Sequence, residues 1–193
     1  MSAARLERER AALVIVDVQE AFAKAVPRYG LVVRAAATLA RGAAALGVPV
    51  IVTEQYPKGL GRTDPAVAAA LPDGVEPLEK VEFSAAGAPG FDLAGRDQVL
   101  LCGIEAHVCV AQTALELLER GVAVHVAADA VASRSAENEA IGLRRTERAG
   151  AVPTSVETAL FELLGRAGTD EFKAVQRLIL EYAPNPASNG GAA

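Results

Sequence analysis

Three side chains of the sequence could together carry out acyl transfer through a thiol: Asp17, Lys80 and Cys109. That chemistry needs a base that takes the thiol proton, a cation that favours the thiolate, and backbone donors that hold an oxyanion. Each residue by itself says little, because a single cysteine is most often a small buried apolar residue and a single lysine is usually solvated. The elements that position the three residues therefore decide whether they can form a site.

The segment around Cys109 changes from a strand pattern to a helix pattern. Val99–Cys102 is an unbroken apolar run, typical of a strand buried on both faces of a parallel sheet. After Gly103, from about His107, apolar residues recur at three- and four-residue steps, which predicts a helix. We therefore expect Cys109 in the first turn of a helix beyond the carboxyl end of a central strand, where open α/β sheets bind ligands. The free N–H groups and the dipole at such a helix start favour a thiolate over a thiol.

The rest of the chain alternates between strand and helix patterns. The predicted strands span 11–18, 48–53, 75–81, 98–102, 122–127 and 151–153. The predicted helices span 31–46, 64–70, 89–93, 135–150, 155–164 and 170–182, and 54–64 is a loop rich in Gly and Pro. Pro77 predicts an edge position or a late start for its strand, because proline cannot donate to a sheet ladder.

Six strands alternating with helices predict an α/β fold, a three-layer α/β/α sandwich with a six-stranded, mostly parallel sheet. Right-handed crossovers place the carboxyl ends of such strands on one edge of the sheet. The residues expected at this edge are Asp17, Thr53, Glu54, Lys80, Gly103 and Asp129. From its position alone, Asp17 either caps the turn that follows its strand or faces a site at this edge.

Length and composition are those of an ordinary globular protein. The chain has 193 residues, of which 51% are hydrophobic and 22% charged, and we expect one domain over residues 1–183 with a disordered tail at 184–193. The net charge of −5 leaves no basic footprint for nucleic acid or an acidic membrane. Two cysteines and a charged N-terminus without an apolar core predict a cytoplasmic protein with free thiols. No stretch approaches the ~18 apolar residues of a membrane span.

Three segments resemble the isochorismatase-like cysteine hydrolases, a superfamily that includes nicotinamidase and N-carbamoylsarcosine amidohydrolase. They are LVIVDVQEAF at 13–22, EKVEFSA at 79–85, and LLCGIEAHVCVAQTALELLERGVAVHVAADAVASRS at 100–135. TEQYPKGLG at 53–61 and the region 161–182 look especially like the isochorismatase-domain-containing subgroup, whose substrates are poorly defined. The resemblance covers roughly residues 11–182.

The resemblance implies an isochorismatase-like fold and a covalent mechanism on a small amide, carbamoyl or related acyl compound. Asp17 would accept the thiol proton and later activate water, Lys80 would hold the carboxylate and the sulfur ionised, and Cys109 would attack the substrate to give a thioester. A cis peptide bond would join Ile104 to Glu105. The backbone N–H groups of Glu105 and Cys109 would then face the oxyanion. The family tends to form dimers or tetramers, so we also expect a homo-oligomer.

Two departures from the family patterns narrow these expectations. Metal-dependent nicotinamidases carry an Asp and several histidines after the second strand, whereas this chain has Thr-Glu-Gln-Tyr at 53–56. Its only histidines are His107 and His125, too few for a His-rich metal site, so we expect no catalytic metal and no other cofactor. The isochorismate-cleaving members lack the cysteine, and Cys109 therefore favours amide or acyl chemistry over vinyl-ether hydrolysis.

Several side chains near the strand ends could shape a substrate pocket. These candidates are Gln19, Phe22, Gln55, Tyr56, Phe83 and His107. Core packing explains the two Phe nearly as well, and a solvent-facing position explains His107 equally well. We interpret Cys102 and His125 as core residues, and Arg134 as part of a surface salt bridge rather than a substrate-anion site.

Two functions of other classes stay open beside hydrolysis. A non-catalytic interaction protein could keep the fold and the residues without a usable pocket. A thiol redox sensor would instead oxidise Cys109 reversibly to a sulfenate.

Overall fold

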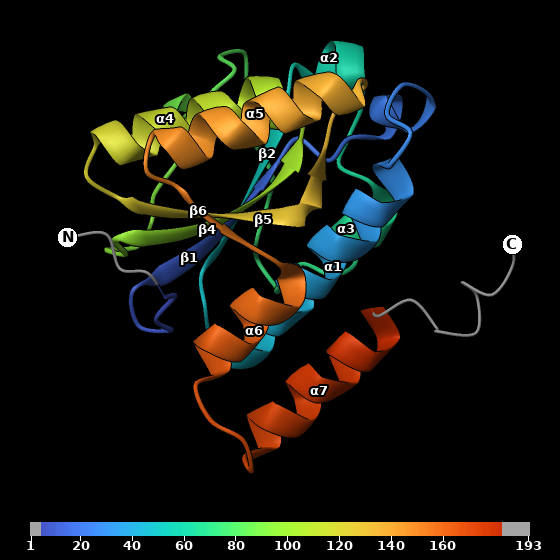
Figure 1. Ribbon diagram of the computed structural model, residues 1–193. Helices are drawn as coiled ribbons and strands as arrows, with labels where there is room; N and C mark the ends of the chain where they lie inside the picture. The colour runs from blue at the N-terminus through green and yellow to red at the C-terminus, as the bar shows by residue number, and fades with distance from the viewer. Residues whose placement is uncertain (1–4, 183–193) are drawn as a thin grey trace, which may run out of the picture.

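A single parallel sheet lies between two helical layers in the computed structural model, which describes residues 5–182 (Figure 1). Within that range the strand order is β3-β2-β1-β4-β5-β6, and every neighbouring pair is parallel. The predicted three-layer α/β/α architecture is confirmed, with the sheet parallel throughout. The tail expected at 184–193 lies outside the described residues.

The strands and helices follow in strict alternation along most of the chain. The strands are β1 (Ala11–Val16), β2 (Val50–Gln55), β3 (Leu78–Lys80), β4 (Gln98–Ile104), β5 (Ala123–Ala132) and β6 (Val152–Thr154). The α-helices are α1 (Tyr29–Leu46), α2 (Pro57–Leu60), α3 (Pro65–Ala68), α4 (Ala111–Glu119), α5 (Ala136–Arg148), α6 (Val156–Leu164) and α7 (Asp170–Tyr182). Short irregular turns are η1 (Glu20–Lys24), η2 (Ala85–Gly87) and the π-type turn η3 (Ala106–Val110).

Local signals explain most of these boundaries. Strand β3 starts directly after Pro77 and is an edge strand, as the proline predicted. Ser135 caps the start of helix α5, because its hydroxyl accepts a hydrogen bond from the backbone N–H of Asn138. Helix α1 ends at Gly47, which adopts a left-handed conformation with φ of 66°.

Several sequence-based boundaries were wrong; the strand expected at 75–81, for example, spans only Leu78–Lys80. The helix expected at 89–93 does not form, and one short turn, η2, lies just before it, at 85–87. The segment 54–64 is not all loop, because proline at the first position starts the one-turn helix α2. Strand β5 continues beyond 127 to Ala132 across an irregularity in its pairing with β4.

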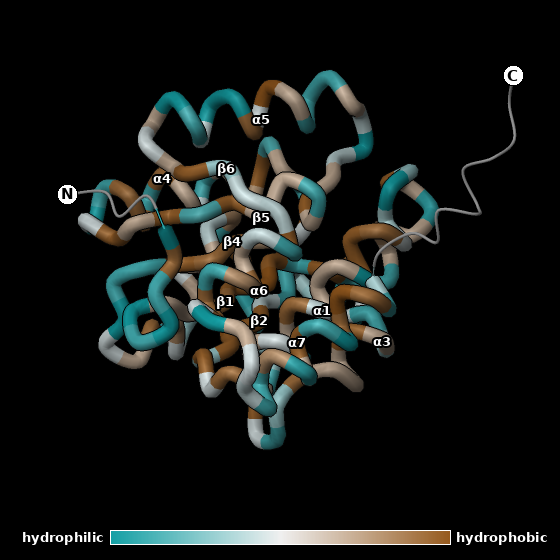
Figure 2. Tube along the Cα trace, turned by 60° about the horizontal axis from the view of Figure 1, so that its bottom comes forward, coloured by the Kyte–Doolittle hydropathy of each residue, from teal (hydrophilic) through white to brown (hydrophobic). Residues whose placement is uncertain are grey.

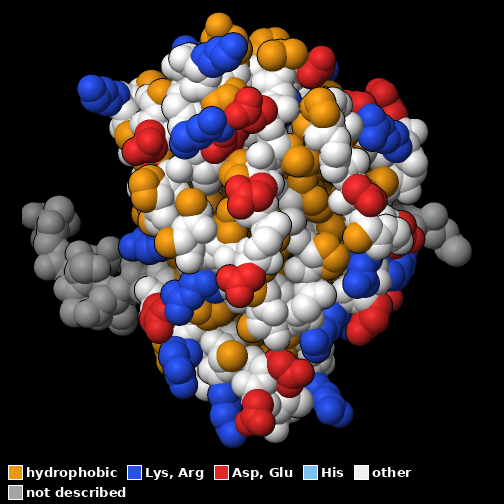
Figure 3. All heavy atoms as spheres, turned by 180° about the vertical axis from the view of Figure 1, so that it is seen from behind, with side chains coloured by type: hydrophobic (Ala, Val, Ile, Leu, Met, Phe, Trp, Pro, Cys, Tyr) orange, Lys and Arg blue, Asp and Glu red, His pale blue; other side chains and the backbone are white. Residues whose placement is uncertain are grey.

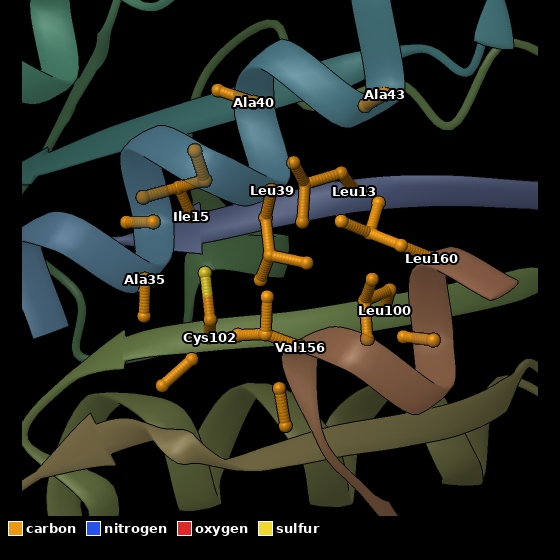
Figure 4. Close-up of a cluster of buried hydrophobic side chains, with 14 of the residues drawn as sticks. Leu13, Ile15, Ala35, Leu39, Ala40, Ala43, Leu100, Cys102, Val156 and Leu160 are labelled. Carbon is orange, nitrogen blue, oxygen red and sulfur yellow. The ribbon is translucent and has the colours of Figure 1, made fainter. Parts of the chain in front are cut away.

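Both faces of the sheet are covered, which explains the unbroken apolar runs of the central strands. Leu13 and Ile15 of β1 belong to the cluster under α1, α6 and α7, whereas Val14 and Val16 belong to the cluster under α4 and η3. The hydrophobic segments accordingly gather in the interior of the fold (Figure 2). Cys102 points into the first cluster, between α1 and α6, which confirms it as a core thiol (Figure 4).

No helix of the described residues is long and apolar enough to cross a membrane.

Gly103 lets β4 approach β1 at the edge where the predicted site residues lie. Its φ is +127°, and a Cβ placed there would lie 2.0 Å from the carbonyl oxygen of Val16. Val16 directly precedes Asp17, so any side chain at 103 would push on the backbone that carries this carboxylate.

Gly103→Ala should therefore lower the free energy of unfolding by roughly 3–5 kcal/mol, through both a strained φ and a backbone clash. Urea unfolding measures this loss. Gly74→Ala is the matched control, because Gly74 also has a positive φ (+80°) but has open space around it. It should cost only about 1–2 kcal/mol. Equal losses in the two variants would show that the close approach of β4 to β1 has no energetic weight.

Candidate active site

Asp17 lies at the carboxyl end of β1 with its side chain fully buried. Its φ of 52° turns the chain sharply, and the conformation is held because its N–H donates to the Thr53 carbonyl and its own carbonyl accepts from Gln19 N–H. One carboxylate oxygen accepts from the Thr53 hydroxyl at 2.7 Å. The other accepts from the Lys80 ammonium, also at 2.7 Å. The strained turn thus aims the carboxylate at the sheet edge.

Lys80 is the last residue of β3, and its side chain is fully buried. Besides Asp17, its ammonium donates to the amide oxygen of Gln55 at 2.7 Å and to the carbonyls of Glu82 and Phe83, each at 3.1 Å. A buried ion pair is costly unless all its hydrogen-bonding capacity is used. Four acceptors meet that requirement here, so the ammonium is fixed next to the Asp17 carboxylate.

Cys109 lies in the π-type turn η3 between β4 and α4, and only 6% of it is exposed. Sequence placed it in the first turn of an ordinary helix, whereas α4 begins two residues later. Helix α5 packs directly on this turn. Gly142 permits the close approach, since a Cβ there would lie 2.7 Å from the Ala106 carbonyl oxygen. Such wide turns inside helices are frequent at functional sites.

The Cys109 thiol lies close enough to Asp17 and Lys80 for both charges to act on its pKa. Burial, together with the negative charge of Asp17, raises the pKa of the Cys109 thiol to about 12, although the Lys80 ammonium acts in the opposite direction. The expectation of a thiolate favoured by a helix start was wrong, because burial and the adjacent carboxylate outweigh the cation. The structure brings the three predicted residues to the same edge of the sheet, and the raised pKa favours the protonated form of the sulfur at neutral pH.

Two glutamine side chains, Gln19 and Gln55, form a hydrogen-bonded chain that ends on the Lys80 ammonium. Gln19 is fully buried, donates to the carbonyls of Gln55 and Gly61, and accepts from the Gln55 N–H. Gln55 accepts from Lys80 and donates to the Val81 carbonyl. Both residues were candidates for a substrate pocket, but their amides are occupied by protein groups. No local sequence signal distinguishes a pocket-lining glutamine from one that supports the ion pair, because the hydrogen-bond partners lie 25 or more positions away.

Glu54 anchors the 54–64 segment beside the site. One carboxylate oxygen accepts from the N–H and the hydroxyl of Thr63, and the other accepts from Arg62 at 2.9 Å. Burial opposes ionisation of Glu54, but the hydrogen bonds from Thr63 and Arg62 outweigh it and hold the carboxyl pKa below its ordinary value. Arg62 also pairs with Glu79 of β3, which links the segment to the strand that carries Lys80.

The peptide bond between Ile104 and Glu105 is cis, at the position that the family resemblance implied. The buried Glu105 carboxylate accepts from the backbone N–H and the Nε of Arg134, whose side chain is 63% exposed. Arg134 is therefore in a salt bridge, as the sequence interpretation expected. His107 is partly exposed and lies 2.9 Å from the Ser133 hydroxyl.

A pocket of about 390 Å³ opens at the β3 edge of the sheet beside the buried ion pair. It is lined by Tyr56, Pro57, Lys58, Glu79, Lys80, Val81, Glu82 and Pro89. This volume suits a small molecule, but neither Asp17 nor Cys109 lines it. Of the candidate pocket residues, Tyr56 lines this pocket. Phe83 is half-exposed and is not part of the lining, and Phe22 packs on the core.

Within residues 5–182, no group of three or more His, Cys, Asp or Glu side chains is arranged to hold a metal ion. Glu54, which stands where the metal-dependent relatives carry ligands, uses its carboxylate on Thr63 and Arg62.

Comparison with known proteins places this geometry in a family. The Isochorismatase domain family model matches residues 11–158. The chain belongs to the isochorismatase family. Isochorismatase domain-containing protein 2 of Macaca fascicularis is 42% identical over 176 residues, which cover 90% of this chain and 84% of that protein. The structure of MAR1 ribonuclease from Caenorhabditis elegans is 39% identical, with a TM-score of 0.89, and covers 98% of this chain and 99% of that chain.

A more distant structure agrees in fold. YcaC from Escherichia coli, described as an octameric hydrolase of unknown specificity, is 24% identical with a TM-score of 0.78 and covers 94% of both chains. Membership in the isochorismatase family confirms the resemblance seen in the sequence and supports a hydrolase role.

The depressed pKa of Glu54 gives this isochorismatase-family chain a testable pH dependence. The carboxyl pKa is lower in the folded than in the unfolded chain, so its contribution to stability is complete above about pH 4.5 and is lost as pH falls through the folded value. Glu54→Gln should lower the free energy of unfolding by about 1–3 kcal/mol at pH 7, and the deficit should shrink toward pH 3. Urea unfolding at several pH values measures both effects.

Glu79→Gln is the matched control for Glu54→Gln, because Glu79 binds the same Arg62 but is 58% exposed. It should change the free energy of unfolding by less than about 0.5 kcal/mol at any pH. A deficit in Glu54→Gln that stays constant from pH 7 to pH 3 would contradict the assignment.

The protonated state of Cys109 predicts slow alkylation at neutral pH. The rate of modification by iodoacetamide should rise about tenfold per pH unit through pH 10, without the plateau near pH 8.5 of an ordinary thiol. Peptide mass spectrometry follows Cys109, with the wholly buried Cys102 as an internal unreactive thiol. A plateau below pH 8 would mean that Lys80 dominates and that the resting state is a thiolate.

Proposed function

We propose that this isochorismatase-family chain is a cysteine hydrolase that acts on a small amide, carbamoyl or related acyl compound through a covalent thioester. The observation that carries the proposal is the buried Asp17–Lys80 ion pair, 2.7 Å apart, with the buried Cys109 thiol close enough for both charges to act on it. A structural ion pair needs no thiol, and a structural cysteine needs no buried base. Together they form a nucleophile with its activating group.

In the acylation step Asp17 takes the thiol proton while the sulfur attacks the substrate carbonyl carbon. The charge that leaves Asp17 passes through the sulfur to the carbonyl oxygen as the C–S bond forms, so Lys80 stabilises it on the carboxylate and on the sulfur until the oxyanion forms. The backbone N–H groups of Glu105 and Cys109 are our proposed donors to the oxyanion. Removal of one such donor typically costs about 2.7–4 kcal/mol in barrier height.

The remaining steps return the site to its starting state. The C–N bond of the tetrahedral adduct breaks, the leaving amine takes the proton from Asp17, and a thioester remains on Cys109. Asp17 then takes a proton from water, the resulting hydroxide attacks the thioester, and the carboxylic acid departs. The sulfur regains its proton from Asp17, so that one water is consumed for each amide cleaved.

Several finer features belong to the same proposal. The pocket beside Lys80 gives room for a small substrate, with Tyr56 of its lining as a contact residue. The half-exposed Phe83, which follows the lining residue Glu82, is the second contact residue that we propose. We also propose a homo-oligomer, supported by the octameric state described for the E. coli relative. Two unpaired thiols fit a reducing compartment, the cytoplasm.

We do not extend the ribonuclease activity named for the C. elegans protein to this chain. The net charge of −5 and the interspersed acidic and basic side chains on the face in Figure 3 offer no continuous basic track for a phosphate backbone. RNA cleavage is therefore included as an outcome of the experiment rather than as the proposal.

A panel of small amides, ureido acids, acyl esters and a short RNA tests the function, with ammonia or acid release as the measurement. Cys109→Ala should lose at least about 10³-fold in kcat on any active substrate, because no other nucleophile is placed at the site. It should keep its melting temperature, since alanine fills most of the buried space.

Cys102→Ala is the control. It should retain wild-type turnover at a temperature where it is folded, although the smaller core side chain lowers its stability. Rapid quenching of the wild type should reveal an acyl adduct on the Cys109 peptide. Full activity of Cys109→Ala would reject the nucleophile. RNA cleavage that survives this substitution would favour the ribonuclease reading, and a reversible sulfenate without any hydrolysis would favour the redox sensor.

A further inference from the structure

Thr113 connects the nucleophile turn to the segment that binds Lys80. It lies four residues after Cys109 in α4 and is fully buried. Its hydroxyl donates to the Cys109 carbonyl at 2.7 Å and accepts from the Ala85 N–H at 2.8 Å. One hydroxyl therefore bonds two segments that come from different parts of the chain.

The Ala85 end of this connection leads straight to the ammonium. Only Ser84 separates Ala85 from Phe83, whose carbonyl accepts from Lys80, as does the carbonyl of Glu82. Ser84 is itself fixed, because its hydroxyl accepts from the Ala86 N–H as the cap of η2. A short chain of hydrogen bonds and two peptide units thus connects the Lys80 ammonium to the Cys109 backbone.

Two other buried threonines that lie within helices differ from Thr113 in what their hydroxyls bond. Thr38 donates to the Arg34 carbonyl at 2.8 Å, four residues back in α1, and Thr146 donates to the Leu143 carbonyl at 2.9 Å within α5. Among the described residues, these two hydroxyls bond only inside their own helices. Thr113 makes the same intrahelical bond and adds a second bond across to η2.

We propose that Thr113 is a positioning residue, which sets the distance between the Cys109 sulfur and the Lys80 ammonium by fixing η2 to α4. This inference rests on the proposed thiol hydrolysis and deepens it, because it names what keeps the cation in register with the nucleophile. The competing explanation is apolar packing alone, since Ala85 and Ala86 share a hydrophobic cluster with Cys109.

Thr113→Val separates the two explanations, because it keeps the shape and the apolar contacts but removes both hydrogen bonds. On the substrate identified by the panel, kcat should fall about 30- to 100-fold with KM within threefold of wild type. Thr113→Ser keeps the hydroxyl and should recover turnover to within about fivefold. Thr38→Val, which loses only an intrahelical bond, should leave both kinetic constants unchanged.

A second measurement needs no substrate. At pH 9 the iodoacetamide rate of Cys109 should fall about tenfold in Thr113→Val, because a sulfur held less closely to Lys80 gains one unit of pKa. Thr113→Ser should label at nearly the wild-type rate. Thr113→Ala serves in place of Thr113→Val should the latter not fold, and melting curves of all variants exclude general unfolding.

The outcomes keep the two proposals apart. Wild-type kcat and labelling in Thr113→Val overturn the positioning role and leave the hydrolase proposal intact. Activity that survives Cys109→Ala overturns the hydrolase, and the labelling series still decides whether Thr113 controls the sulfur. A loss in Thr113→Val that Thr113→Ser does not recover would assign the effect to packing and would also overturn the positioning role.

Discussion

The buried ion pair between Lys80 and Asp17 is the interaction on which the rest of this edge of the fold depends. Desolvation costs several kcal/mol for each ion, and a buried pair is tolerated only where good geometry and further hydrogen bonds compensate. Thr53, Gln55 and two main-chain carbonyls supply those bonds. The polar residues at the carboxyl ends of the first three strands therefore form one hydrogen-bond network that compensates the two buried charges.

That network forms only because the register of the three parallel strands brings their carboxyl ends side by side. Val16 pairs with Thr53 across β1 and β2, and Gln55 pairs with Lys80 across β2 and β3. A shift of one residue in the short strand β3 would turn Lys80 to the opposite face of the sheet and leave Asp17 buried without a cation. The Arg62–Glu79 bond, which ties β3 to the 54–64 segment, and the Thr113 bond to Ala85, just after β3, both act against such a shift.

Sequence reasoning succeeded where a pattern is local or repeats. The apolar runs of β1 and β4 and the alternation of strand and helix patterns predicted the layers, and Pro77 predicted the edge strand. It failed where the outcome depends on partners distant in the chain. The two glutamines were polar residues near strand ends until the fold showed what they bind, and the protonation of Cys109 depends on burial that no spacing encodes.

A resting thiol rather than a thiolate also bears on which function fits this site. Redox sensors combine an accessible sulfur with a lowered pKa, because the thiolate is the form that reacts with oxidants. Cys109 has the opposite properties: it is 6% exposed, and its pKa is raised by burial. A base placed beside it creates the nucleophile only when a substrate carbonyl can accept the electrons. Burial of the sulfur thus suits the proposed hydrolase better than a redox sensor, because its proposed base, Asp17, is already held in place by Lys80.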